Sequence, residues 1–523
     1  MKRPVILAIL DGWGEWDISM GNAIANANLP NIDRLNKYYP KLLLQASGLS
    51  VGLPWGVKGN SEVGHQAMGT GQIIFQYLPA IDMAISDGGF KKNEVLNRNF
   101  DLVKKNNSSL HILGLISNGG VHSHINHLIA ILDLAKEKEI SKVFIHAITD
   151  GRDTSPQSAK EFIEMINAKL AKIKIGKIAT LSGRYYTMDR NNNWDRIEKS
   201  FRVFTEGNGI KEKCPLEALD NQYARDIYDE RLEPVNIVDE ANKPIGLIAE
   251  NDTVLCFNFR KDRSRQISEA FISQDFDKFS REVKNINFLA FTNYKKDLIK
   301  EIVFPPQEIS ARLGEEISKN NKNQLRIAET EKYAHVTYFF NGGNEKPFPG
   351  EDRVIIPSKK VSIYSEAPEM SAYELTDKVL GAISENKYDF ILINFANPDM
   401  VGHTGDLSAG VRAVETVDEC LGKIIDKILK IKGTLLISAD HGNIEEMIDT
   451  ITYKKDTEHS TNPVPAWLVS LDYCREKALK SKSSFEIEGM IVDIPPTILD
   501  LLGIEKNKEM TGVSLLNLFK KKI

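Results

Sequence analysis

The chain has 523 residues, of which 42% are hydrophobic and 27% are charged, and its formal net charge is -5. These are ordinary globular values, so they exclude a disordered chain, and the weak charge gives no reason to expect nucleic acid or an anionic membrane as a partner. A chain of this length is expected to form two or more domains. No apolar run approaches the roughly 20 residues of a membrane span. The four cysteines lie far apart without a C-x-x-C pair, which favours a reducing, cytoplasmic setting.

Three apolar runs are expected to be buried strands that each lead to an aspartate. V-I-L-A-I-L runs into Asp11, F-I-L-I-N-F precedes Asp399, and T-L-L-I-S precedes Asp440. Apolar residues at helical spacing predict a helix from Ser408 to Ile431. Alternating strands and helices of this kind predict an α/β fold with largely parallel sheets, which bind ligands at the carboxyl ends of their strands.

The middle of the chain repeats this pattern with arginine in place of aspartate at the strand ends. We interpret residues 76–306 as a second α/β domain, inserted into a first domain that comprises residues 1–75 and 307–523. Pro305 and Pro306 form a plausible return linker, because consecutive prolines favour extended backbone.

Three carboxylates and three imidazoles of the first domain are expected to lie together at the strand ends. Mixed ligands of this kind suit Mn²⁺ or Zn²⁺, and their number is too large for one ion and right for two. The alternative interpretation is that Asp11 and Asp440 only cap helix N-termini. The candidate metal ligands are Asp11, Asp399, His403, Asp440, His441 and His459.

Ser61 lies in the segment V-K-G-N-S-E-V-G-H, where a helix could begin. Serine is a common N-cap residue, which is the simpler interpretation. A catalytic role would need a metal or a base to activate the hydroxyl, because a free hydroxyl is a poor nucleophile. A site with two cations would supply that activation and would also neutralise phosphoryl oxygens.

The inserted domain carries a set of arginines that suits a small, highly anionic substrate. Guanidinium groups bind phosphate and carboxylate oxygens two at a time, although any one of these arginines could be a surface salt bridge. Asp153 could be part of a structural ion pair or could transfer protons. Lys332, which follows the insertion, could meet the phosphoryl group. The other candidates are His122, Arg152, Arg184, Arg190, Arg260 and Arg263.

An ordered set of motifs that runs from one end of the chain to the other resembles the cofactor-independent phosphoglycerate mutase family of the alkaline-phosphatase-like superfamily. Short pieces such as A-D-H-G recur across that superfamily, whereas the ordered set is specific to the mutases. The motifs are L-D-G-W-G (10–14), G-N-S-E-V-G-H (59–65), G-G-V-H-S-H (119–124), D-G-R-D (150–153), G-R-Y-Y-T-M-D-R (183–190), F-N-F-R-K-D-R-S-R (257–265), A-E-T-E-K-Y-A-H-V-T (328–337), N-F-A-N-P-D-M-V-G-H-T-G (394–405) and A-D-H-G-N (439–443).

The resemblance implies an alkaline-phosphatase-like metal-binding domain and an inserted substrate-binding domain. It implies two Mn²⁺ ions per chain, with other divalent metals possible. One ion would be held by Asp399, His403 and His459, and the other by Asp11, Ser61, Asp440 and His441.

The resemblance also implies a reaction, the interconversion of 2- and 3-phosphoglycerate. Ser61 would carry the phosphoryl group, Asp153 would act as acid and base, and free 2,3-bisphosphoglycerate would not be required. The only expected partner is the substrate, 2- or 3-phosphoglycerate, and the protein is expected to be a monomer. Because glycerate must reorient without escaping, we expect a closable cleft with hinges near residues 73–78 and 303–308. The expected substrate-binding residues are His122, Arg152, Asp153, Arg184, Arg190, Arg260, Arg263 and Lys332.

Some positions depart from the family pattern. Gln72 stands where arginine is usual, Asn118 where aspartate is usual, and Asn193 leaves no arginine before Trp194. Ser460 replaces a common threonine and keeps the hydroxyl. None of these changes removes a candidate ligand or the candidate nucleophile.

Two alternative functions stay open at the level of the sequence. A hydrolase or phosphopentomutase of the same superfamily would share the metal ligands but not the arginine-bearing insertion. A catalytically silent paralogue could serve as a metal- or metabolite-binding module, although such a copy has no chemical reason to keep every candidate ligand, the serine and the aspartate.

Overall fold

The chain divides into two units, one of which interrupts the other in sequence. The computed structural model describes residues 3–282, 284–479 and 485–523. Unit 1 comprises Met1–Gln76 and Glu308–Ile523, and unit 2 comprises Tyr77–Gln307. These limits fall within one residue of those expected from the sequence.

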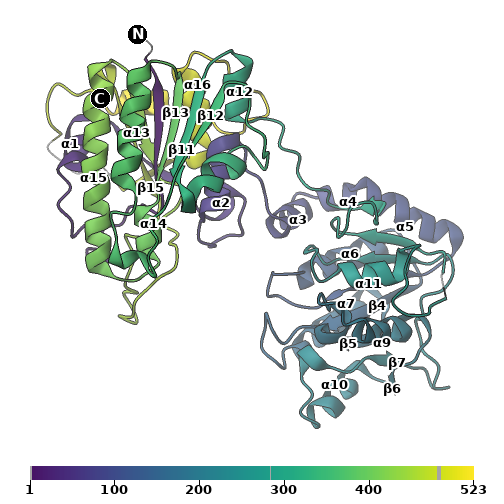
Figure 1. Cartoon of the computed structure of the whole chain (residues 1–523). Coiled ribbons are helices and arrows are strands. Elements are labelled where there is room, and N and C mark those ends of the chain that lie inside the picture. Colours follow the sequence, from purple (N-terminus) through teal and green to yellow (C-terminus); the bar gives the residue numbers. More distant parts are fainter. Residues whose placement is uncertain (1–2, 283, 480–484) are drawn as a thin grey trace. The chain divides into compact units, whose positions relative to one another are not determined.

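An eight-stranded sheet forms the centre of unit 1 (Figure 1). Its strand order is β12-β11-β13-β1-β14-β15-β2-β16; the first five strands are parallel neighbours, and β15 runs antiparallel to both β14 and β2. All six residues of β1 are buried between β13 and β14. The strands are β1 (Val5–Leu10), β2 (Lys41–Gln45), β11 (Gln324–Glu329), β12 (Glu351–Ile356), β13 (Phe390–Phe395), β14 (Thr434–Ser438), β15 (Val464–Val469) and β16 (Ile487–Met490).

Helices cover the sheet of unit 1, and Figure 1 shows α13 and α15 running side by side across one face. The helix predicted from residue 408 to 431 is α15, and its N-cap Asp406 accepts a hydrogen bond from the backbone N–H of Ala409 (3.0 Å). The helices are α1 (Pro30–Tyr38), α2 (Ser61–Thr70), α12 (Leu313–Lys319), α13 (Ala372–Glu385), α14 (Asn397–Gly402), α15 (Leu407–Lys430), α16 (Ile494–Leu501) and α17 (Leu516–Lys521).

Unit 2 is built around a second eight-stranded sheet, of order β10-β9-β8-β3-β4-β5-β7-β6. The neighbours from β10 to β5 are parallel, and β7 runs antiparallel to β5. The strands are β3 (Leu110–Leu115), β4 (Val143–Thr149), β5 (Lys177–Gly183), β6 (Ile210–Glu212), β7 (Val235–Ile237), β8 (Thr253–Cys256), β9 (Asn287–Ala290) and β10 (Glu301–Ile302).

Two hydrophobic clusters stabilise unit 2. Phe162 of α7 belongs to the larger cluster, and Phe201 of α9 belongs to the smaller one. Parallel strands buried by helices on both faces are what near-continuous apolar runs predict, so the α/β fold class inferred from the sequence is confirmed. The helices are α3 (Tyr77–Ser86), α4 (Gly89–Lys92), α5 (Glu94–Asn106), α6 (Ile125–Glu137), α7 (Ala159–Ile173), α8 (Arg184–Thr187), α9 (Trp194–Thr205), α10 (Pro215–Tyr223) and α11 (Arg265–Ile272).

Across the residues that the structure describes, no helix combines the length and apolar character that crossing a bilayer requires.

Candidate active site

The central strands of unit 1 bring three aspartates to one edge of the sheet. Asp11 directly follows β1, Asp440 follows β14, and Asp399 lies in α14 just after β13. These strands are parallel neighbours, so their carboxyl ends meet. All three side chains are buried. No helix begins at Asp11 or Asp440, so helix capping does not account for either residue.

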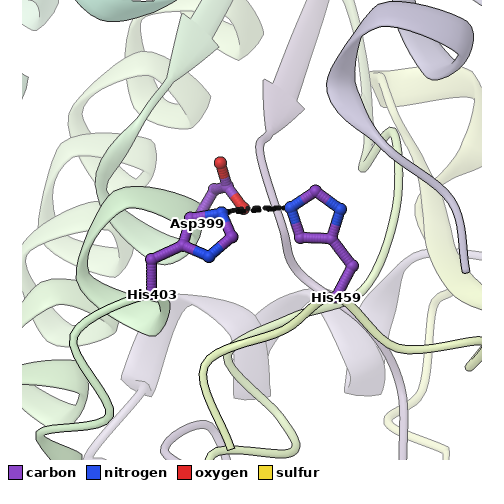
Figure 2. A group of neighbouring side chains, drawn as sticks. All are labelled: Asp399, His403 and His459. Atoms are coloured by element: carbon purple, nitrogen blue, oxygen red, sulfur yellow. Dashed lines mark hydrogen bonds and ion pairs between the residues drawn. The ribbon is translucent and has the colours of Figure 1, made fainter. Parts of the chain in front are cut away.

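Asp399 and two histidines form the first candidate metal group (Figure 2). Nε2 of His403 and Nε2 of His459 each lie 3.3 Å from Oδ1 of Asp399, and the two nitrogens are 3.1 Å apart. Nδ1 of His403 contacts the carbonyl of Thr457 (2.7 Å), and Nδ1 of His459 contacts that of Gly59 (2.8 Å). Because a carbonyl only accepts hydrogen bonds, both Nδ1 atoms carry hydrogen, and Nε2 is in each histidine the nitrogen that faces the carboxylate and could bind metal.

Ser61 lies in a second buried group with Asp11, Asp440 and His441. Its Oγ is 2.9 Å from Nε2 of His441 and 3.1 Å from Oδ1 of Asp11. Nε2 of His441 lies 3.5 Å from Oδ1 of Asp11 and 3.6 Å from Oδ2 of Asp440. Ser61 begins α2, but the N-cap is Asn60, whose side chain accepts from the backbone N–H of Val63 (3.1 Å). The Ser61 hydroxyl is therefore left for other contacts.

Lys332 lies in the middle of these groups. Its Nζ is 2.7 Å from Oδ1 of Asp11, 2.6 Å from Oδ2 of Asp399 and 2.8 Å from Oγ of Ser61. Burial alone would lower the pKa of Lys332, but Asp11 and Asp399 outweigh it and raise that pKa. Lys332 thus stays charged and places an ammonium group directly beside the serine hydroxyl.

Negative charge in the cluster also acts on His441. Burial would lower the pKa of the His441 imidazole, but Asp440, Asp11 and Asp399 outweigh burial and raise that pKa to about 10. Three buried carboxylates therefore favour additional positive charge beyond that of Lys332.

In unit 2, three candidate substrate residues follow three adjacent parallel strands. His122 follows β3, Asp153 follows β4, and Arg184 follows β5. Nη1 of Arg184 donates to Oδ2 of Asp153 and to Oδ1 of Asp150, both at 2.5 Å. Nε2 of His122 is 3.9 Å from Oδ2 of Asp153. Burial, assisted by Arg184, lowers the pKa of His122 to about 4, so its imidazole is neutral at pH 7.

The remaining candidate arginines of unit 2 lie near the same strand ends. Arg190 and Arg260 share Asp262, at 2.7 Å and 3.1 Å from its two oxygens. Burial, with the nearby charges of Arg184, Arg190 and Arg152, lowers the pKa of Arg263. Arg152 is largely exposed and lies 3.4 Å from Glu230. The structure therefore brings together all the candidates of unit 2, whereas Lys332 belongs to the cluster of unit 1.

Comparison with known proteins shows the family of the chain. Residues 81–296 match the family described as BPG-independent PGAM N-terminus. The chain is 51% identical to the 2,3-bisphosphoglycerate-independent phosphoglycerate mutase of Clostridioides difficile over 99% of this chain and all of that protein. It is likewise 51% identical to the protein of that name from Clostridium acetobutylicum, over 98% of this chain and 99% of that one.

The chain belongs to the 2,3-bisphosphoglycerate-independent phosphoglycerate mutase family. The crystal structure of phosphoglycerate mutase from Leishmania mexicana, determined at low cobalt concentration, is similar over 98% of this chain and 97% of that one, with 31% identity and a TM-score of 0.54. The mutase family was inferred from the ordered motifs, and this inference is confirmed.

The residues that a phosphoglycerate mutase of this family would use to hold metal fit divalent cations. Oδ2 of Asp440 is buried and accepts no hydrogen bond from any residue that the structure describes, although Nδ1 of His65 is 3.0 Å away. Nε2 of His403, Nε2 of His459 and Oδ1 of Asp399 lie within 3.3 Å of one another, so the three atoms could bind one cation together. Both features are what a carboxylate and imidazole cradle for metal requires.

Several residues around the site were not singled out from the sequence. Nδ2 of Asn394 donates to Oδ2 of Asp11 (2.7 Å), and Nδ2 of Asn443 donates to Oδ1 of Asp399 (2.8 Å). Both asparagines lie inside motifs typical of the family, which is the signal that could have found them. The buried residue Glu445 comes two residues after A-D-H-G-N in the chain and so lies outside those motifs.

Proposed function

We propose that this chain interconverts 2- and 3-phosphoglycerate through a phosphoserine on Ser61, without free 2,3-bisphosphoglycerate. The observation that carries the proposal is the surroundings of the Ser61 hydroxyl, which contacts Asp11, His441 and Lys332 at hydrogen-bonding distance. The names of the full-length relatives support the same reaction.

The metal assignment follows the two side-chain groups of unit 1. Asp399, His403 and His459, which lie close enough to share one ion, would hold one Mn²⁺. Asp11, Ser61, Asp440 and His441, which contact one another, would hold the other, with other divalent metals possible. When bound, these cations would lower the pKa of the Ser61 hydroxyl, so that its proton is lost to solvent, and would neutralise phosphoryl oxygens.

The protein's own groups carry out the transfer. Oγ of Ser61 forms a bond to phosphorus while the bond from phosphorus to the substrate oxygen breaks, and Nζ of Lys332 binds the phosphoryl oxygens. The carboxyl of Asp153 gives its proton to the departing oxygen. In the second half, the Asp153 carboxylate takes a proton from the other hydroxyl of glycerate, whose oxygen then displaces Ser61 from phosphorus.

The arginine cluster of unit 2 would bind the anionic substrate. Arginines bind carboxylate and phosphate oxygens two at a time, so they suit a molecule that carries both groups. The neutral imidazole of His122 can share a hydrogen bond with a hydroxyl without adding charge. We assign substrate binding to His122, Arg152, Arg184, Arg190, Arg260 and Arg263, with Asp153 as the group that transfers protons.

We further propose that the protein works as a cytoplasmic monomer on this small molecule alone. The family resemblance and the cysteine pattern support this proposal. Elution at the volume of a dimer in size-exclusion chromatography would contradict the monomer.

The test is conversion of 3-phosphoglycerate without added 2,3-bisphosphoglycerate. We expect wild-type protein to produce 2-phosphoglycerate, to lose this activity on chelation and to regain it when Mn²⁺ is restored. Ser61→Ala should reduce turnover to background, because no other described side chain holds a nucleophilic oxygen in the same contacts. Its circular dichroism spectrum should remain that of the wild type.

Retained mutase activity in Ser61→Ala would refute the assigned nucleophile. Faster hydrolysis of an aryl phosphate than conversion of phosphoglycerate would favour a hydrolase instead. Binding of phosphoglycerate without any turnover by the wild type would favour a silent paralogue.

A further inference from the structure

Glu445 is a buried carboxylate that accepts four hydrogen bonds. Its Oε2 accepts from the backbone N–H of Gly14 and from that of Asn443, both at 2.9 Å. Its Oε1 accepts from Oγ of Ser460 and from Nδ2 of Asn462, the latter at 3.1 Å. The side chain is 0% exposed, and it forms no ion pair with any residue in the described part of the chain.

These donors come from three segments that are far apart in sequence. Gly14 follows Asp11 on the segment after β1, and Asn443 follows Asp440 and His441 on the segment after β14. Ser460 directly follows His459. A single carboxylate therefore ties together the three segments that carry four of the proposed metal ligands.

The surroundings of Glu445 leave no room for larger residues at two glycines of the family motifs. A Cβ atom at Gly14 would lie 2.2 Å from Oε1 of Glu445, and one at Gly442 would lie 2.3 Å from the same oxygen. Both glycines therefore let backbone approach this carboxylate closely. Ser460 occupies the position where threonine is common in the family, and its hydroxyl is the group that Glu445 binds.

We propose that Glu445 is a positioning residue of the metal centre, which sets the geometry of the proposed ligands without contacting metal itself. The inference rests on the proposed function, because it takes the metal assignment as given. A carboxylate is the side chain suited to this role, since it accepts at both oxygens, whereas a glutamine amide would present N–H groups to two of the four donors.

The donors differ in how well they tolerate glutamine at position 445. The backbone N–H groups of Gly14 and Asn443 can be satisfied by the amide oxygen. Nε2 would then face Ser460 and Asn462, where the serine hydroxyl can accept, but Nδ2 of Asn462 loses Glu445 and keeps only Oε2 of Glu446 (3.2 Å) as an acceptor. Glu445→Gln should therefore disturb chiefly the His459 segment, and with it the proposed ion bound by Asp399, His403 and His459.

The experiment is calorimetric titration of the metal-free, full-length protein with Mn²⁺. Wild type should bind two ions per chain, and Glu445→Gln should weaken binding of one of them by about 10-fold. This is the lower end of the effect of losing a residue that supports metal ligands, because Glu445 holds the ligand segments and does not bond a ligand side chain. Ser460→Ala should weaken the same ion, whereas Ser460→Thr should restore binding because it keeps the hydroxyl. With excess Mn²⁺, Glu445→Gln should regain kcat.

Ser268→Ala provides a matched control, because it removes a buried serine hydroxyl of unit 2 that donates to the Ser264 carbonyl (2.8 Å). It should leave Mn²⁺ affinity unchanged. Mn²⁺ affinities of Glu445→Gln and Ser460→Ala within twofold of wild type would overturn the inference, as would equal weakening in Ser460→Ala and Ser460→Thr. Loss of mutase activity in wild type that binds Mn²⁺ normally would instead contradict the proposed function alone.

Discussion

Asp150 is a buried residue of unit 2 that accepts hydrogen bonds from two of the candidate arginines, Arg152 and Arg184. It accepts from Oγ of Ser117 (2.6 Å), from the backbone N–H of Arg152 (3.2 Å) and of Asp153 (3.0 Å), and from the guanidinium of Arg184. Burial opposes its ionisation, but the hydrogen bonds from Ser117, Asp153 and Arg184 outweigh burial and lower its pKa. Asp150 therefore stays charged and sets the position of Arg184 between two carboxylates.

We expect Asp150→Asn to raise KM for phosphoglycerate roughly tenfold, because losing one charge-assisted hydrogen bond costs about 1.5 kcal/mol. Without the negative charge, the Arg184 guanidinium should shift toward Asp153 and away from the substrate. Steady-state kinetics in saturating Mn²⁺ would measure the change. Asp133→Asn is the control, since Asp133 forms only a partly exposed ion pair with Lys169. A KM no higher than that of the control would argue against this role for Asp150.

At the scale of residues, the sequence was most informative where a side chain follows an apolar run. Asp11 and Arg184 each follow a buried strand directly, so their place at a sheet edge could be predicted. Glu445 and Asp150 could not be assigned in this way, because their roles depend on hydrogen bonds from backbone groups of distant or neighbouring loops. From sequence alone, a glutamate next to a motif is predicted to be an exposed charged residue, and only the tertiary structure shows that Glu445 is buried.

At the end of strand β11, Glu329 is buried where no described basic side chain pairs with it. Its Oε1 accepts a long hydrogen bond from the backbone N–H of Ser371 (3.4 Å), and its Oε2 has no hydrogen-bond partner among the described residues. Burial raises the pKa of Glu329 from 4.5 to about 7. The strand thus holds a carboxyl group that is protonated in the folded protein across the mildly acidic range.

This shift predicts a pH-dependent difference between wild type and Glu329→Gln. Between pH 4.5 and 7 the folded protein keeps a proton that the unfolded chain has lost, so the contribution of Glu329 to stability falls as pH rises through this window. At pH 8 the free energy of unfolding of Glu329→Gln should exceed that of wild type by up to about 3 kcal/mol, and this difference should shrink toward pH 5. Urea unfolding at both pH values would measure it.

The exposed Glu385 on α13 offers the comparison, because Glu385→Gln should change stability equally little at both pH values. A Glu329→Gln variant whose stability relative to wild type is the same at pH 5 and pH 8 would show that Glu329 does not titrate in this window.

At the scale of elements, apolar runs identified β1, β13 and β14 and the helix α15. The order and direction of the outer strands were not predicted. Strand β15 has the same apolar character as the parallel strands β1, β13 and β14, yet it pairs antiparallel with β14 and β2. Pairing depends on residues far apart in the chain, such as Leu44 with Val464, and a single sequence carries no local signal for it.

At the scale of the whole molecule, the chain passes between the two units at Gln76–Tyr77 and at Gln307–Glu308. The second connection includes the exposed residues Pro305 and Pro306. Because every proposed metal ligand belongs to unit 1, changes in the connections should affect turnover without changing metal binding. This separation makes the role of the connections testable.

We expect Gln307→Pro, which extends the proline pair to three, to stiffen the second connection and to lower kcat severalfold. Mn²⁺ affinity, measured by calorimetry, should match that of wild type. Gln307→Ala serves as the control for loss of the side chain. A Gln307→Pro variant that loses kcat and Mn²⁺ affinity to the same degree would contradict a hinge at this position.

Strand β1 precedes the other strands of its sheet in the chain but lies inside that sheet, where Val5 pairs with Phe390 and with Thr434. During translation it must therefore wait as an unpaired apolar segment, whereas unit 2, continuous in sequence, can fold as soon as it leaves the ribosome. His459 arrives later still. A nascent chain that does not yet include His459 cannot gather all the proposed metal ligands around Ser61, so the proposed phosphoryl transfer cannot begin before that segment has been made.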